Sequence, residues 1–212
     1  MLLLSASADD TAPVWEVATG KPVAVLRHTS AVNSAAFSPD GSLIVTASPN
    51  EIARIWTADG TPRATLRGHT RFVFTAAFSP DGKRVVTTSD DRTARIWATA
   101  GGKLLHVLSG HNGLVTEASF SADGTLVVTT SNDNTARVWN VADGQEVLRG
   151  STGDVEAAAF SPDGRLVVMA SADGLARLYS CELCGSSETL LKVARSRITR
   201  GLTPKERRVF LP

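Results

Sequence analysis

This sequence of 212 residues has few aromatic side chains, few cysteines and almost no net charge. Only 6% of its residues are Phe, Trp or Tyr, and four are Trp, so the positions of the Trp residues are informative. Two cysteines, Cys181 and Cys184, are too few to staple a fold of this size, which favours a reducing, cytoplasmic setting. The formal net charge of +1 disfavours nucleic acid as the main partner.

Long apolar runs and the common catalytic motifs are missing as well. No stretch approaches the ~18 consecutive apolar residues of a membrane helix, and residues 1–4 lack the basic lead of a signal peptide, so no membrane partner is expected. The patterns G-x-S-x-G, G-x-G-x-x-G, H-E-x-x-H and G-x-x-x-x-G-K-[ST] do not occur. The pair Cys181 and Cys184 has no second pair of zinc ligands nearby. We therefore expect no catalytic residue, no metal site and no cofactor.

What the sequence does contain is a regular series of rings. The steps between them are 41, 41, 42 and 40 residues for the series Trp15, Trp56, Trp97, Trp139 and Tyr179. From the second ring onward, a Phe lies 19 residues before each ring, and a His lies 9 residues before that Phe, with Ser in place of His in the last unit. Fixed internal spacing with a period of about 40–45 residues is typical of propeller blades.

Each unit also has the pattern of four short strands. Residues 72–79 are apolar and favour β structure, and Pro80-Asp81-Gly82 then predicts a turn, because Pro presets φ and Gly supplies a positive φ. Strands over residues 84–89, 93–97 and 103–108 are expected to follow. The sequence therefore predicts an all-β fold with four antiparallel strands in each unit.

Over residues 1 to about 180 these features resemble the WD40 family. The resemblance rests on the Gly68-His69 and Gly110-His111 pairs, on the S-x-D turns at Ser89 and Ser131, and on the Trp that ends each third strand. It implies a β-propeller in which the His, the Ser of the second strand, the Asp of the next turn and the Trp form a structural hydrogen-bond network. The network predicted on this sequence comprises His28, Ser48, Asn50, Trp56, His69, Ser89, Asp91, Trp97, His111, Ser131, Asp133 and Trp139.

Two units depart from this network. Asn50 stands where Asp is expected, which keeps an acceptor and loses the charge. The last unit has Ser151 and Tyr179 in place of His and Trp, so we predict that the last blade is the least stable. His69, Ser89 and Asp91 could also be taken for a catalytic triad, but active sites are rarely repeated every 41 residues.

The strand count predicts about five blades in a ring that is not closed. Residues 2–5 match a second strand, and no fourth strand is recognisable after Tyr179, so the first and last blades are expected to be incomplete. Our hypothesis is a fragment or C-terminal portion of a longer propeller. The alternatives are an open arc completed by a partner and self-association through the open blade edges.

Residues 181–212 are expected to form a basic helical tail, separate from the repeats of residues 1–180. They contain seven Lys or Arg and three Asp or Glu, and Ser187 can cap a helix. A cap on the last blade and an interaction tail for an acidic partner or nucleic acid both fit this pattern. Residues 190–208 also resemble the closing segment of certain bacterial multidomain WD40 signalling proteins.

The resemblance to WD40 proteins implies a scaffold that binds unidentified protein partners, with no enzymatic activity. Rigid scaffolds with variable loops suit recognition, and Phe and Arg are frequent anchors of interfaces. The alternatives are a propeller hydrolase and a non-functional truncated fragment. The candidate interaction face near the Gly-His loops and the S-x-D turns comprises Arg71, Phe72, Asp90, Arg92, Asn112, Leu114 and Asn132.

Overall fold

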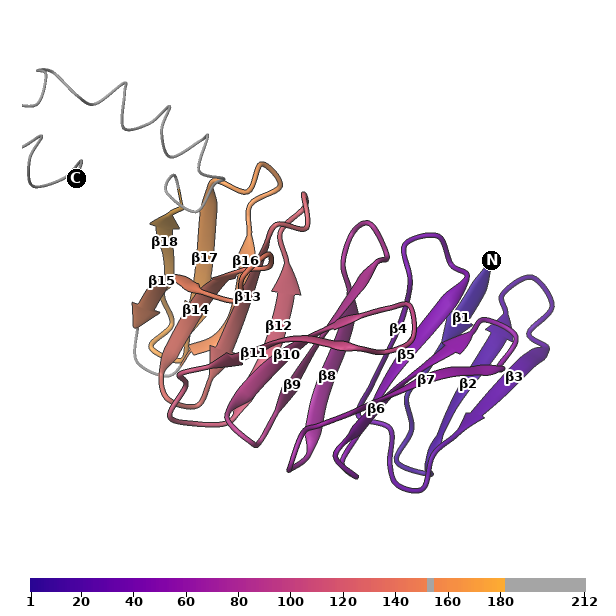
Figure 1. Cartoon of the computed structure of the whole chain (residues 1–212). Coiled ribbons are helices and arrows are strands. Elements are labelled where there is room, and N and C mark those ends of the chain that lie inside the picture. The colour runs from indigo at the N-terminus through magenta and orange to yellow at the C-terminus, as the bar shows by residue number, and fades with distance from the viewer. Residues whose placement is uncertain (152–154, 182–212) are drawn as a thin grey trace, which may run out of the picture.

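The computed structural model describes residues 1–151 and 155–181, which form five antiparallel sheets placed side by side in an open arc (Figure 1). The first and last sheets lie at opposite ends of this arc. In chain order the strands are β1 (Leu2–Leu4), β2 (Thr11–Glu16) and β3 (Pro22–Arg27); β4 (Ser34–Phe37), β5 (Leu43–Ser48), β6 (Ile52–Thr57) and β7 (Pro62–Arg67); β8 (Val73–Phe78), β9 (Arg84–Ser89), β10 (Thr93–Ala98) and β11 (Leu104–Ser109); β12 (Val115–Phe120), β13 (Leu126–Ser131), β14 (Thr135–Asn140) and β15 (Glu146–Ser151); β16 (Val155–Phe160), β17 (Leu166–Ser171) and β18 (Ala176–Ser180).

Each sheet is a meander in which consecutive strands are neighbours. The innermost strands β4, β8, β12 and β16 contact one another along the arc. The first sheet begins with a strand equivalent to β5, and the last sheet has three strands within the described residues. Over residues 1–151 and 155–181, these observations confirm the predicted all-β propeller with incomplete first and last blades and no ring closure. The predicted helical tail lies outside the described residues, apart from Cys181.

A short polar turn joins the first and second strands of each complete sheet. The Ser38 hydroxyl donates to Asp40 Oδ1 at 2.6 Å and accepts from the backbone N–H of Leu43 at 2.9 Å. Gly41 has φ of 71°, a left-handed conformation that glycine adopts without steric cost. The same bonds recur around Ser79, Ser121 and Ser161, which is why the sequence pattern predicted these turns correctly.

The three middle sheets bury apolar side chains on both faces, and each end sheet buries them on the face turned to its neighbour. We call the face turned to the next sheet in chain order the trailing face, and the face turned to the preceding sheet the leading face. Between the second and third sheets, Val45, Ile55 and Leu66 of a trailing face pack with Val85 and Trp97 of a leading face. Equivalent clusters fill the other spaces between sheets.

The hydrophobic core is therefore a series of layers between neighbouring sheets. Because side chains alternate across a strand, adjacent residues such as Val85 and Val86 belong to different layers. The described part of the chain has no helix of a length and apolarity that would allow it to cross a membrane.

Candidate functional site

The repeated histidines and tryptophans meet at a buried threonine. In the third sheet, His69 Nε2 lies 2.7 Å from Thr87 Oγ1, and the indole N–H of Trp97 donates to the same oxygen at 2.9 Å. The other ring nitrogen, His69 Nδ1, lies 2.8 Å from Asp91 Oδ2. One continuous network therefore joins four side chains, which come from the Gly-His loop, from β9, from the turn after β9 and from β10.

The fourth sheet repeats this arrangement with its own residues. His111 Nε2 lies 2.8 Å from Thr129 Oγ1, which accepts from the Trp139 indole at 2.9 Å. His111 Nδ1 lies 3.0 Å from Asp133 Oδ2. The two networks are geometrically equivalent, as expected for two copies of one structural device.

The serine expected to link the two rings occupies a different place. Ser89 Oγ accepts from the backbone N–H of Asp91 at 3.0 Å and donates to the carbonyl of Arg71 at 3.3 Å. It therefore holds the turn and the incoming loop, whereas Thr87 joins His and Trp. A Thr recurs ten residues before Trp56, Trp97 and Trp139, but a Ser recurs eight residues before the same rings, so the spacing does not separate the two hydroxyls.

Hydrogen-bond chemistry assigns the protons in the network. An ionised carboxylate only accepts hydrogen bonds, so Asp91 accepts from the N–H at His69 Nδ1. The Thr87 hydroxyl donates to His69 Nε2, and the Thr87 oxygen accepts from the Trp97 indole. For the equivalent Asp133, burial raises the pKa, but hydrogen bonds from Thr135, the backbone and His111 outweigh it and lower the pKa to about 2. Burial lowers the pKa of His111, so its ring is neutral beside the charged Asp133.

Burial gives this network a structural role. Thr87 and Thr129 are 0% and 1% exposed, so neither hydroxyl can reach a substrate. In the third sheet the His69, Thr87 and Asp91 groups are hydrogen-bonded to one another, and the Trp97 indole occupies the Thr87 oxygen. The network instead satisfies buried polar groups that would otherwise cost roughly 1–3 kcal/mol each.

An arginine explains the glycine that precedes each of these histidines. Arg95 Nη2 lies 3.6 Å from Asp91 Oδ2, and a Cβ placed at Gly68 would collide with the Arg95 guanidinium. Gly68 also has φ of 154°, outside the range that other residues favour. Gly110 stands in the same relation to Arg137. The Gly-His pair therefore leaves space for a charged group over the network.

The second sheet lacks the carboxylate, and its network is incomplete. His28 Nε2 lies 2.8 Å from Thr46 Oγ1, which accepts from the Trp56 indole at 2.9 Å. The Asn50 amide instead donates to the Thr29 hydroxyl at 2.7 Å. Among the described residues, no hydrogen-bond partner reaches His28 Nδ1 or Asn50 Oδ1. Asn50 is therefore not the acceptor for His28 that its position suggested.

This missing partner affects the protonation of the ring. Burial lowers the pKa of His28 to about 4, and the nearby positive charge of Arg54 acts in the same direction. Ser48 keeps the place of its equivalents, with its hydroxyl donating to the carbonyl of Ser30 at 3.4 Å.

The last sheet replaces the network altogether. Met169 stands where the second, third and fourth sheets have the linking threonine, and Tyr179 stands where they have Trp. A Cβ at Gly150 would collide with the Met169 side chain, so this side chain lies directly against the Gly150 backbone. Asp173 pairs with Arg177 at 2.7 Å on the surface. At position 169, packing of a methionine takes the place of a hydrogen-bonding hydroxyl.

The candidate interaction face is formed by loops that hydrogen bonds hold together. The backbone N–H of Asp90 donates to the carbonyl of Phe72 at 3.0 Å, and Arg71 Nη1 donates to Asp90 Oδ2 at 3.3 Å. The equivalent bond in the next sheet joins the N–H of Asn132 to the carbonyl of Leu114 at 3.1 Å. The structure thus brings together Arg71, Phe72 and Asp90, and separately Leu114 and Asn132.

These loops expose groups of different chemistry. Phe72 is 55% exposed although it is a large apolar residue, and Arg71, Arg92, Asn112 and Asn132 are exposed. Arg92 has φ of 67°, and the equivalent positions in other sheets, Asp10, Glu51 and Asn134, share this left-handed conformation. The repeat therefore presents one variable, outward residue at the same turn of each sheet.

A hollow of about 590 Å³ adjoins this face. It is lined by the turn residues Asn132 and Asn134 and by the exposed Glu117 and Glu156 of the inner strands β12 and β16. Most of the residues that line this hollow are polar, as in the rim of a protein–protein interface. In the described ranges, no group of three or more His, Cys, Asp or Glu side chains could hold a metal ion.

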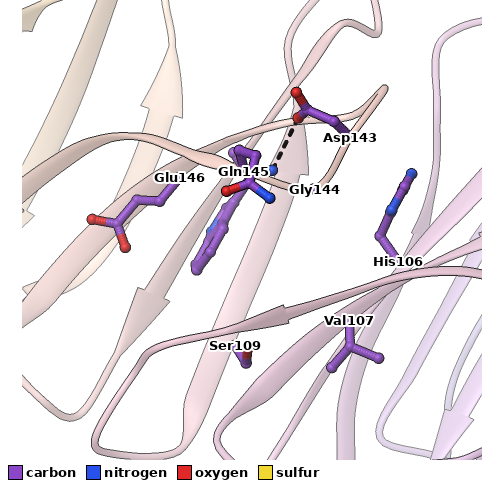
Figure 2. Close-up of a pocket in the computed structure, with 8 residues that line it drawn as sticks. His106, Val107, Ser109, Asp143, Gly144, Gln145 and Glu146 are labelled. Carbon is purple, nitrogen blue, oxygen red and sulfur yellow. Dashed lines mark hydrogen bonds between the residues drawn. The ribbon is translucent and has the colours of Figure 1, made fainter.

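A second hollow, of about 260 Å³, lies on the outer side of the arc. Figure 2 shows His106 and Val107 of β11 on one side, and the turn around Asp143 and Gln145 on the other. The Asp143 carboxylate accepts from the backbone N–H of Gln145 at 3.0 Å, which holds the turn. Glu146 is paired with Arg137 at 2.8 Å. The acidic groups here are already used in structural bonds.

Comparison with known proteins identifies the repeat. The family model described as "WD domain, G-beta repeat" matches residues 20–57, 60–98, 102–140 and 144–180, which together cover more than half of the chain. No curated protein matched this sequence. Each matched segment contains the outermost strand of one sheet and three strands of the next, for example β7 followed by β8, β9 and β10. The repeat in sequence therefore links neighbouring sheets covalently.

Proposed function

Since this chain belongs to the WD40-repeat family, whose repeats are generally protein-interaction scaffolds, we propose that it binds a protein partner on the face formed by its Gly-His loops and S-x-D turns. The observation that supports this proposal is the exposure of Phe72 beside the Arg71–Asp90 pair. Aromatic residues and Arg are enriched in protein–protein interfaces.

The loops that form this face are held by a rigid framework. Backbone hydrogen bonds join them in pairs, and the buried networks of His69 and His111 fix the strands from which they extend. A preorganised face loses less conformational entropy on binding than a mobile one. The face combines Arg71 and Arg92 with Asp90 and two asparagines, so we propose a partner surface of mixed polarity with an apolar pocket for Phe72.

The cellular setting is part of the same proposal. We place the chain in the cytoplasm, which its small number of cysteines supports, and within a larger bacterial-type signalling protein, which the sequence of residues 190–208 supports. Finding repeats in frame upstream of Met1, together with a nucleotide-binding or effector module, would establish that parent architecture. An upstream region without either would contradict it.

Site-specific photocrosslinking tests the proposed face. A photoreactive amino acid at position 72 is expected to capture a discrete partner, whereas the same group at position 107, an exposed apolar residue on β11, is not. Phe72→Ala combined with Arg92→Ala, probed by a crosslinker at position 112, is expected to reduce capture at least about tenfold, which corresponds to 1.4 kcal/mol. Equal capture from positions 72 and 107 would contradict the proposal.

A further inference from the structure

The two end sheets expose faces that every other sheet buries. The leading face of the first sheet and the trailing face of the last sheet both carry apolar side chains, and no described residue packs over them. All eight other faces lie in the layers between sheets.

The leading face of the first sheet is centred on Leu3 and Trp15, which are opposite each other across β1 and β2. Leu3 is 58% exposed, whereas its equivalents Ile44, Val85 and Val127 are completely buried. Trp15 is only half-buried, whereas Trp56, Trp97 and Trp139 are buried. These apolar side chains are of the kind that fills a layer between two sheets, but no second sheet packs against them within the described residues.

The trailing face of the last sheet is centred on Leu178 and Val168, which are opposite each other across β17 and β18. Leu178 is 69% exposed, whereas its equivalents Ile55, Ile96 and Val138 are completely buried. The neighbouring positions on this face, Ala170 and Ala176 among them, are small and uncharged. This face is also one half of a layer.

We infer that, in the protein of residues 1–212, these two faces are occupied by a second copy of the chain, with the first sheet of one copy docked on the last sheet of another. Each layer within the chain joins a trailing face to a leading face, and the same combination recurs four times. The two exposed faces are one of each kind. A contact between copies therefore continues an interface that the chain already uses.

Charge does not oppose this contact. At the position equivalent to Arg54, Arg95 and Arg137 the first sheet carries Pro13, so docking buries no arginine of this sheet at that point. The exposed residues of the trailing face, with Leu178 at its centre, are uncharged along β17 and β18. Burying apolar area of this kind favours association, and the entropic cost of association opposes it.

The geometry of this contact is heterologous. Two different surfaces meet, so an assembly of any size still offers one free leading face at one end and one free trailing face at the other. Two copies supply ten sheets, and propellers typically close with 4–8 blades. We therefore expect stepwise growth with concentration in place of a closed dimer.

Sedimentation velocity of the full chain over a hundredfold concentration range tests the inference. The unaltered protein is expected to increase in mass with concentration. Leu3→Asp and Leu178→Asp each place a charge at the centre of one face, and each variant alone is expected to sediment as a monomer, with association weakened at least about tenfold. An equimolar mixture of the two is expected to form a dimer and nothing larger, because it contains one intact face of each kind.

Val107→Asp is the matched control. Val107 is 43% exposed on an outer strand away from both end faces, so this variant is expected to associate like the unaltered chain. Because Leu3 and Leu178 are exposed, both variants are expected to keep the circular dichroism spectrum of the unaltered chain. A monomer at all concentrations would overturn the inference, as would a mixture that stays monomeric. Association lost in only one of the two variants would show that this face pairs with itself, which also overturns it.

Discussion

At the scale of single residues, one hydroxyl connects two rings in each of three sheets. The Thr87 oxygen accepts from Trp97 and its proton is directed at His69, all within a site that water does not reach. Its loss leaves two buried polar atoms without a partner. We therefore expect loss of the threonine hydroxyl to lower the unfolding free energy more than loss of any other single group in the network.

Thr87→Val tests this importance. The valine has nearly the same shape but no hydroxyl, and we expect a loss of about 2–4 kcal/mol of unfolding free energy in urea titration, since each unsatisfied buried group costs roughly 1–3 kcal/mol. Thr87→Ser keeps the hydroxyl and is expected to lose less than half as much. A valine variant within about 0.5 kcal/mol of the unaltered protein would show that the bonds contribute little.

Asn50 makes the opposite change testable. Asn50→Asp introduces the carboxylate that the third and fourth sheets have, facing the unpaired Nδ1 of His28 and near Arg54. We expect a gain of about 1–2 kcal/mol in unfolding free energy at pH 7, since a charge-assisted bond replaces an unsatisfied nitrogen. Asn134→Asp, the same change at an exposed turn position, is the control and is expected to change stability by less than about 0.5 kcal/mol.

The pH dependence gives a second measurement on the same variant. The pKa of His28 is about 4 in the folded chain and about 6.5 in an unfolded one. As pH falls from 6.5 to 4 the unfolded chain takes up a proton that the folded chain does not, so stability falls in this window. A carboxylate at position 50 favours the charged ring and raises its pKa, so this fall is expected to be smaller in Asn50→Asp. An unchanged slope would mean that the new carboxylate does not reach His28.

At the scale of the element, the last sheet differs from its neighbours. Met169 and Tyr179 replace the hydrogen-bonded Thr and Trp, and its trailing face is exposed. Local opening needs little energy where few buried contacts hold a sheet. Amides of β16 and β17 are therefore expected to exchange with solvent at least about tenfold faster than those of β12 and β13.

Hydrogen exchange measured by mass spectrometry on dilute, monomeric protein checks this expectation. The comparison of β16 and β17 with β12 and β13 is internal to one molecule, so differences in solution conditions cancel. Equal or slower exchange in the last sheet would show that packing of Met169 against Gly150 replaces the network without loss of stability.

At the scale of the whole molecule, stability is distributed over layers between neighbouring sheets. In such arrays, stability is approximately a sum of terms within each unit and terms between nearest neighbours. Leu66 of β7 is 1% exposed and packs in the layer between the second and third sheets. A cavity at this position should therefore weaken two sheets directly and distant sheets much less.

Leu66→Ala is expected to lower the unfolding free energy by about 2–5 kcal/mol. Exchange should accelerate in β4 to β11 more than in β16 to β18. Val107→Ala, in the corresponding strand of the next sheet but 43% exposed, is the control and should change stability by less than about 0.5 kcal/mol. Uniform acceleration along the chain would show a single cooperative unit in place of a sum of layers.

The sequence by itself determined the elements of this fold and their number. The ring period, the Pro-Asp-Gly turns and the alternation of residues such as Val85 and Val86 are local and periodic features, so they specify strands, turns and the incomplete end sheets without any knowledge of contacts. The positions of Phe72 and Asp90 on neighbouring loops also followed from the repeat.

Only the tertiary structure decided which atoms meet. Thr87 and Ser89 lie on the same strand two residues apart and carry the same functional group, so composition could not tell which hydroxyl reaches His69. The side chain of Asn50 could turn to His28 or to Thr29, and the loop geometry directs it to Thr29. Such choices depend on the register between strands and on the side-chain conformation within a packed layer, and these are properties of the assembled sheets.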